Sequence, residues 1–228
     1  NEAGGISDPD YLKNADKFVQ YLRAQPEVIH VFSLTDTFKR LNKNMHGDDP
    51  GYYKLPEDRN LAAQYLLLYE MSLPYGLDLN NQIDVDKKST KIAVTLETLT
   101  SNEVITFDDN AKAWLEQNFS QVQPYSSGPT IMFAHLGMRN IVSMLTGTSI
   151  ALVFISATLI FFLASFKYGM ISLLPNLTPA LAAFGIWALS VGQVGIGLSV
   201  VTGMTLGIIV DDTVHFLSKY LRARREKG

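Results

Sequence analysis

Long uncharged segments in the second half of the chain limit its fold more than any other feature of the sequence. Residues 140–166 contain no Asp, Glu, Lys, Arg or His, and they exceed the roughly 20 apolar residues that cross a bilayer core. A backbone in lipid must satisfy its own hydrogen bonds, and a helix does so within one segment. We therefore predict a membrane-spanning helix over 140–166.

A second uncharged segment, residues 168–210, is too long for one crossing and about right for two. Its stretch "GQVGIG", Gly192 to Gly197, is typical of a tight turn because of its glycines. The sequence therefore predicts two further spans, at about 171–191 and 198–217. Together the three spans form an all-α membrane domain over 140–228.

Basic residues flank these spans unevenly. The tail "KYLRARREKG" holds five Lys and Arg residues, the link "SFKYG" holds one, and "GQVGIG" holds none. By the positive-inside rule we expect the tail and the first link to be cytoplasmic. For a bacterial protein this predicts a multi-pass protein of the inner (plasma) membrane, with residues 1–139 in the periplasm.

The first 139 residues have the composition of a soluble acidic domain. The chain holds 19 basic and 22 acidic residues, but only six basic and three acidic residues follow Arg139. No basic stripe with interleaved aromatic residues occurs, so we expect no nucleic-acid partner. The chain begins at Asn1 without an initiator Met or a cleavable apolar stretch. We interpret it as a piece of a longer protein.

Apolar periodicity predicts the elements of residues 1–139. Apolar residues recur at helical spacing in 10–25, after a cap at Ser7 or Asp8. Further helices are expected at 61–73 and 108–119, strands at 28–34, 90–99 and 122–125, and turns over 41–60. Apart from the helix at 61–73, this order is that of a ferredoxin-like βαββαβ unit without its first strand. We therefore expect an α+β domain before the membrane domain.

The third span contains two adjacent carboxylates, Asp211 and Asp212, where lipid disfavours charge. Each costs roughly 2.5 to 3.5 kcal/mol at a helix centre if it is charged and unpaired. Gly203, Gly207, Asp211 and His215 recur every four residues and so form one stripe along a helix. The two glycines form a G-x-x-x-G pattern, which lets another helix approach closely. We predict that the glycines serve helix packing and that the acids face protein or water.

Adjacent carboxylates in a medium of low dielectric constant raise the pKa of one another. Such a pair can exchange protons near physiological pH, and its titration belongs to the pair. His215 lies one helical turn from both acids. We therefore predict that Asp211, Asp212 and His215 form a proton relay whose charge biases the packing of this helix.

Other patterns in the sequence point to neither catalysis nor metal binding. No G-x-S-x-G, Walker A or G-x-G-x-x-G pattern occurs. The acidic stretch at 78–86 departs from a calcium loop at Ile83 and Ser89. We expect no enzyme activity, no catalytic residues, no metal and no cofactor. Tyr65, Tyr69 and Tyr75 are a candidate substrate groove, although such spacing is more often that of a core.

The third span, "GMTLGIIVDDTVHFLSKYLRARRE", resembles the fourth transmembrane helix of a repeat in the resistance-nodulation-division (RND) superfamily. The similarity is greatest to the branch of MMPL and hopanoid exporters. The segment "SLLPNLTPALAAFGIWAL", with Pro175, Asn176 and Pro179, is similar to the third helix of that family. Residues 1–139 resemble the later part of the porter loop that precedes the second helix.

This resemblance implies an exporter of hydrophobic or amphiphilic, lipid-like molecules that is driven by the proton-motive force. Residues that match Asp211 and Asp212 are the proton relay of that family. The chain would then hold part of one porter loop and transmembrane helices 2–4 of one repeat. Its partners would be membrane lipid or a hydrophobic substrate, and the remaining helices of the parent transporter. Association into a homo-oligomer is left open.

Two other functions are compatible with the same residues. In the first, the protein is a lipid-sensing or partner-docking membrane module without transport, and the acids hold helices together. In the second, Asp211, Asp212 and His215 bind the metal of an intramembrane hydrolase. Only Asn140, Asn176 and Gln193 on the other spans are candidates for further ligands, which disfavours the hydrolase.

Overall fold

The computed structural model describes residues 3–74, 78–162, 166–171, 173–192 and 195–227. It is mostly helical, and it divides into two compact units, residues 1–128 and 129–228. The elements in chain order are η1 (Gly5–Ser7), α1 (Pro9–Arg23), β1 (Val28–Phe32), α2 (Leu34–Met45), η2 (Pro50–Tyr52), α3 (Arg59–Ser72), η3 (Leu79–Asn81), β2 (Ala93–Leu96), α4 (Ser101–Asn118), α5 (Pro129–Phe162), α6 (Phe166–Ile171), α7 (Leu173–Ser190) and α8 (Ile196–Lys227).

The first unit contains a small sheet of two antiparallel strands, β1 and β2. Two helices cover one face of this sheet, because α1 and α4 share a hydrophobic cluster with both strands. Val19 and Leu22 of α1 and Val31 of β1 form its buried centre. The helix–sheet arrangement supports an α+β unit, and the larger ferredoxin-like sheet is not seen among the described residues.

A second hydrophobic cluster joins α1, α2, α3 and two short 3-10 helices. Phe38 of α2 and Leu66 of α3 are almost completely buried in it. The helix α2 corrects the prediction of turns at 41–60, because residues 41–45 continue a helix that Ser33 caps. This helix places Phe38 and Leu41 on one apolar face, a spacing that the polar residues around it obscure.

Local signals located most elements of the first unit correctly. The carboxylate of Asp8 caps α1 by accepting hydrogen bonds from the N–H groups of Asp10 and Tyr11. Thr100 and Glu103 form a capping box at α4, which starts the helix seven residues before the predicted Asp108. The strand predicted at 122–125 is wrong, since these residues form no ladder in the structure.

Burial raises the pKa of Tyr11 from 10.0 to about 12, partly opposed by a backbone hydrogen bond at Thr90. A raised pKa in the folded state gives stability that is fully present below the unfolded value. We therefore expect the first unit to lose stability as the pH rises from about 10 toward 12, and Tyr11→Phe to reduce this loss. Urea unfolding of both proteins across this pH range, with fluorescence detection, measures the difference. An equal loss in the Phe variant would contradict the assignment.

The second unit is a set of apolar helices, and among its described residues three helices are long and apolar enough to cross a membrane. These candidate spans are Pro129–Phe161, Leu173–Ser190 and Val200–Ala223. The structure therefore supports a membrane-embedded protein. The first helix, α5, begins at Pro129, before the domain boundary predicted at residue 139. Its 34 residues extend about 50 Å, which exceeds a hydrocarbon core of about 30 Å.

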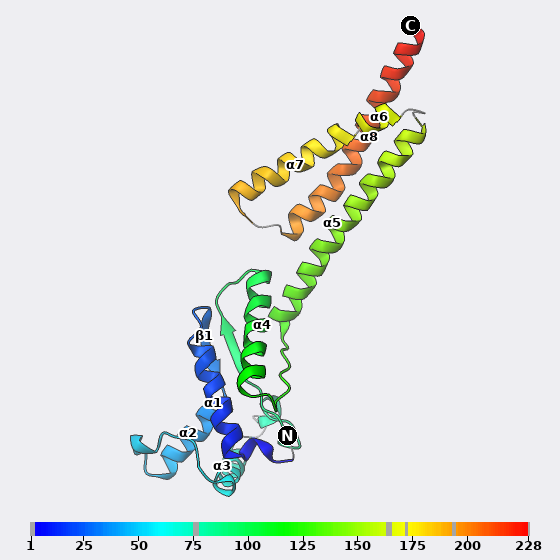
Figure 1. The fold of residues 1–228 in the computed structure, drawn as a ribbon. Coiled ribbons are helices and arrows are strands. Elements are labelled where there is room, and N and C mark those ends of the chain that lie inside the picture. Colours follow the sequence, from blue (N-terminus) through cyan, green and yellow to red (C-terminus); the bar gives the residue numbers. More distant parts are fainter. Residues whose placement is uncertain (1–2, 75–77, 163–165, 172, 193–194, 228) are drawn as a thin grey trace. The chain divides into compact units, whose positions relative to one another are not determined.

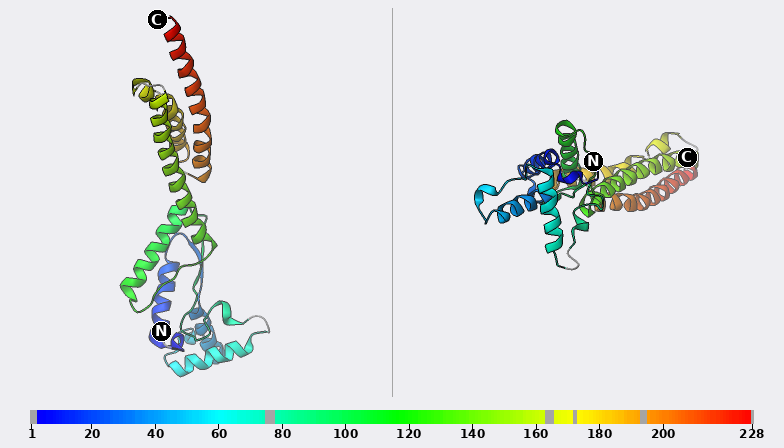
Figure 2. Two further views of the ribbon diagram at one scale, coloured as in Figure 1. Left: turned by 90° about the vertical axis from the view of Figure 1, so that its right-hand side faces the viewer. Right: turned by 90° about the horizontal axis from the view of Figure 1, so that it is seen from below.

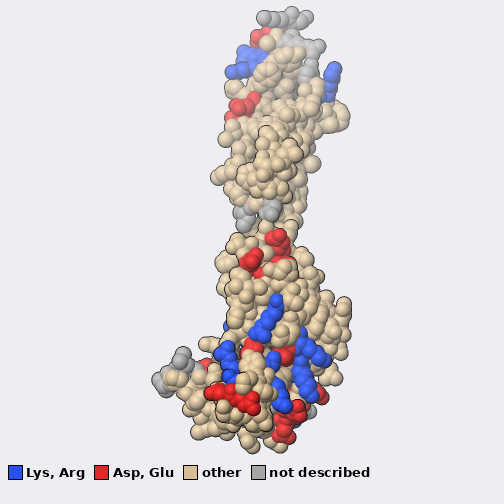
Figure 3. Space-filling view, turned by 90° about the vertical axis from the view of Figure 1, so that its left-hand side faces the viewer, with Lys and Arg blue, Asp and Glu red and all other residues tan. Residues whose placement is uncertain are grey.

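Two helices, α5 and α7, pack against α8, and Figures 1 and 2 show α8 continuing past the short helix α6. Serine and threonine side chains in these helices donate to carbonyls one turn earlier on their own helix, which satisfies them without water. They are Ser149, Ser156, Thr158, Thr178, Ser190, Thr202, Thr205 and Thr213. The charged atoms of this unit gather toward one end in Figure 3.

Candidate functional site

The predicted relay residues lie in the second half of α8, beyond its apolar first half. Asp211, Asp212 and His215 are all exposed in the isolated unit. None of them makes a hydrogen bond or ion pair with any residue that the structure describes. Within the same residues no group of three His, Cys, Asp or Glu side chains could hold a metal ion. The three titratable groups are therefore available to a partner outside these helices.

The opposite face of α8 is the one buried in the unit. Its buried residues are Thr202, Leu206, Thr213 and Leu217, whose spacings of four and seven keep them on one face. Thr213 follows directly after the two acids in the sequence. Its side chain is buried against the neighbouring helices, whereas Asp211 and Asp212 are on the exposed side of α8. The packing of α8 thus turns the carboxylates away from the buried seam.

The glycines of the predicted stripe differ in their surroundings. An added Cβ at Gly203 would lie 3.7 Å from the Thr148 hydroxyl of α5, an ordinary contact. At Gly207 a Cβ would meet nothing within 4 Å among the described residues. Gly203 therefore lies near α5, whereas Gly207 shares the open face of Asp211 and His215.

A hydrogen bond inside the helical unit joins α7 to α8. The Thr213 hydroxyl lies 2.9 Å from Asn176 Oδ1 and 2.8 Å from the carbonyl oxygen of Ile209. A hydroxyl has one proton, so these two acceptors compete for it. Asn176 is completely buried, and its Nδ2 has no partner among the described residues. The contact therefore joins α7 to the buried face of α8, directly after the acid pair in the sequence.

We expect Thr213→Val to weaken the association of α7 and α8 by about 0.6 kcal/mol, and by at most about 1.7 kcal/mol, which is the range for such bonds in membranes. The change keeps the shape of the side chain and removes its hydroxyl. Unfolding of the full chain in mixed micelles, with a double-mutant cycle to Asn176→Ala, measures the coupling. Thr205→Val is the matched control, because that hydroxyl bonds only within α8. A coupling of zero would contradict the assignment.

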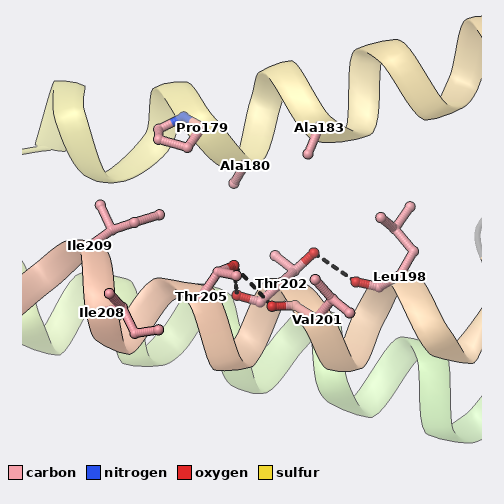
Figure 4. Close-up of a pocket in the computed structure, with 9 residues that line it drawn as sticks. All are labelled: Pro179, Ala180, Ala183, Leu198, Val201, Thr202, Thr205, Ile208 and Ile209. Carbon is pink, nitrogen blue, oxygen red and sulfur yellow. Dashed lines mark hydrogen bonds between the residues drawn. The ribbon is translucent and has the colours of Figure 1, made fainter.

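A groove of about 320 Å³ lies between α7 and α8. Figure 4 shows small residues of α7 facing larger residues of α8 across it. Its hydroxyls, on Thr202 and Thr205, donate to carbonyls of α8 itself, so the groove offers hydrocarbon surface. Neither acid lines it. The lining residues are Pro179, Ala180, Ala183, Leu198, Val201, Thr202, Thr205, Ile208 and Ile209.

The two described tyrosines of the candidate substrate groove, Tyr65 and Tyr69, belong to the hydrophobic cluster of the first unit. Tyr65 is buried, and its hydroxyl donates to Asn42 Oδ1 over 3.1 Å. Tyr69 packs against the same cluster, and Tyr75 lies outside the described residues. The exposed side of α3 instead presents Leu67, Leu68 and Met71.

The stretch that resembles a calcium loop is held by its own hydrogen bonds. The Asp84 carboxylate accepts hydrogen bonds from the N–H groups of Lys88 and Ser89, each over 2.7 Å. These backbone bonds, that of Ser89 first, hold the pKa of Asp84 below its usual value. This carboxylate therefore orders a turn.

Sequence reasoning located the acid pair and missed the hydrogen bond beside it. Asn176 was noted as part of a motif and as a candidate further ligand of a metal, and Thr213 had no assigned role. An amide and a hydroxyl within apolar spans were a usable signal, because polar groups in lipid form hydrogen bonds with partners on neighbouring helices.

Comparison of the chain with protein-family models, with curated proteins and with solved structures finds no match.

Proposed function

We propose that this chain is part of an RND-type exporter of hydrophobic or amphiphilic, lipid-like molecules, driven by the proton-motive force. In this proposal Asp211 and Asp212, assisted by His215, carry protons across part of the membrane. The observation that carries the proposal is the exposed carboxylate pair on a helix that is otherwise apolar enough to span a bilayer.

Exposure of this pair to lipid would be unfavourable. Two charged carboxylates would cost about 5 to 7 kcal/mol in total at a helix centre, and the cost is smaller for this pair because it lies off centre. The open face at Gly207 gives a further helix room to cover them. A cation or a water-filled path on that helix would stabilise the charged form of the carboxylates. Protonation of the carboxylates would remove this attraction and release the partner helix. Protonation thereby couples to helix packing.

The first unit fits an extracytoplasmic porter domain in the same proposal. Its helices α1 and α4 on one face of a sheet are half of a ferredoxin-like arrangement, which strands from the rest of the transporter would complete. In this proposal the first unit lies in the periplasm of a bacterial cell, the helices cross the inner membrane and the tail of α8 is cytoplasmic, an orientation that the uneven basic flanks support.

Proton flux in proteoliposomes tests the proposal. The full-length transporter is reconstituted with a pH-sensitive dye inside the vesicles, and a pH gradient is imposed. We expect flux above that of empty vesicles, increased by an added amphiphilic substrate. Flux equal to that of empty vesicles, with or without amphiphiles, would overturn the proposal.

A lipid-sensing or partner-docking module without transport is the second candidate function. The hydrocarbon groove between α7 and α8 favours it, because such a groove suits an acyl chain whether or not protons move. Lipid binding without any proton flux in the same vesicles would favour this module over the exporter.

A further inference from the structure

We infer that the end of α8 is a binding collar for anionic phospholipid headgroups of the bilayer that holds it. The collar consists of the five basic residues of the tail: Lys219, Arg222, Arg224, Arg225 and Lys227. The inference requires α8 to cross a membrane, and it does not require the protein to transport anything.

The length of α8 sets the depth of the collar. The helix runs without interruption from Ile196 to Lys227, 32 residues, and about 20 residues fill a hydrocarbon core. A crossing of that length that starts near Leu198, as the sequence predicts, ends near Leu217, six residues before the end of the candidate span Val200–Ala223. Residues 219–227 then extend about 12 Å further along the axis, through the level of the headgroups.

The helical positions of the basic residues surround the axis. At about 100° per residue, and counted from Lys219, the other four lie at about 80°, 140°, 240° and 300°. No sector wider than about 100° lacks a basic residue. A protein partner on one side would select a stripe about 100° wide, whereas lipids surround a helix. The all-round arrangement therefore favours headgroups.

Charge in this collar is almost all of one sign. Glu226 is its one acid, and its carboxylate pairs with Arg222 Nε over 3.0 Å, one turn away. Basic residues close to a bilayer surface attract anionic lipids, and the attraction falls off within a Debye length of about 8 Å. Lys219 and Arg222 lie about 3 and 8 Å beyond Leu217 along the axis, within that distance of the hydrocarbon edge, and the other three basic residues lie further out at the level of the headgroups.

The short helix α6 adds a sixth basic residue near the same end of the unit. It carries Lys167 beside the exposed apolar residues Phe166, Met170 and Ile171. Apolar side chains next to a lysine suit the boundary between headgroups and acyl chains. Figures 1 and 2 show α8 extending past α6, which agrees with a tail that leaves the hydrocarbon.

Spin-labelled lipids test the collar directly. The full chain is reconstituted in phosphatidylcholine vesicles of symmetric composition, so that either orientation exposes the tail to the same lipids. Electron paramagnetic resonance measures the association of spin-labelled phosphatidylglycerol relative to spin-labelled phosphatidylcholine. We expect a preference of roughly two- to fivefold at low salt, the effect of about one basic residue at the surface, and its loss at about 1 M salt.

Variants separate charge from helix structure. Replacement of all five basic residues by Gln should abolish the preference, the charge-conserving R222K/R224K/R225K variant should retain it, and Glu226→Gln should increase it. If the variant with all five Gln replacements fails to insert into the vesicles, variants with one Gln replacement should each reduce the preference for phosphatidylglycerol. An unchanged preference in the Gln variants, or a preference that salt does not reduce, would overturn the inference.

Discussion

Asp211→Asn and Asp212→Asn are each expected to abolish proton-driven transport while the protein still inserts into the membrane. Asparagine has nearly the shape of aspartate but cannot exchange a proton, so it removes titration and preserves packing. Both acids lie on the exposed face of α8, and their side chains make no hydrogen bond or ion pair with described residues, so neither change should disturb the helical unit. We expect proton flux and substrate export to fall at least about 100-fold, within the range that a positioned acid–base group contributes.

Asp109→Asn is the matched control for this experiment. Asp109 is an exposed carboxylate of α4 in the first unit, so its loss should leave transport unchanged. Membrane insertion of all three variants is measured by extraction and by thermal unfolding. Transport at the wild-type rate in both α8 variants would show that the pair has another role. Loss of insertion in either would show that the carboxylates stabilise the fold.

Phe38→Ala is expected to destabilise the first unit by about 3 to 5 kcal/mol, the cost of removing a large aromatic side chain from a core. Phe38 is 1% exposed and lies in the cluster that joins α1, α2 and α3. Since many domains are stable by only about 5 to 15 kcal/mol, this loss would leave much of the unit unfolded at moderate urea.

Trp114 is a suitable probe for that measurement. It stacks on Tyr21 of α1 with ring centroids 4.9 Å apart, so its fluorescence reports whether α1 and α4 remain together. The experiment uses the full chain with Trp187→Phe, which leaves one tryptophan. Leu67→Ala is the control, because Leu67 is 54% exposed and should cost less than about 0.5 kcal/mol. Equal effects of the two changes would contradict the observed core.

The three candidate membrane helices could be located from the sequence, although α5 begins 11 residues before the predicted span. An uncharged segment of sufficient length forms a spanning helix because its backbone hydrogen bonds are satisfied within the segment itself. No residue from a distant part of the sequence is needed to predict it. The cap of α1 was an equally local signal, whereas the capping box of α4 at Thr100 and Glu103 was missed and the helix was predicted to begin only at Asp108. The helix α2 and the absence of a strand at 122–125 could not be predicted from local sequence. The secondary structure of short or polar segments depends on burial against other elements.

The acid pair could also be predicted from local sequence, because charged residues within an apolar segment are recognised without knowledge of the fold. The residues that surround the pair in the structure could not be predicted in this way. Asn176 and Thr213 lie 37 positions apart in the sequence and are joined by a hydrogen bond on the face of α8 opposite Asp211 and Asp212. The spacing of Tyr65 and Tyr69 suggested a groove, and packing placed them in the core.

The sequence by itself determined which segments are apolar enough for a membrane and where their few titratable and basic residues lie. Only the tertiary structure decided which side of α8 is buried, that Gly203 lies near α5 while Gly207 lies open, and that the acids face outward. The physical reason is that helix composition is a property of one segment, whereas the rotation of a helix depends on the side chains of the helices beside it.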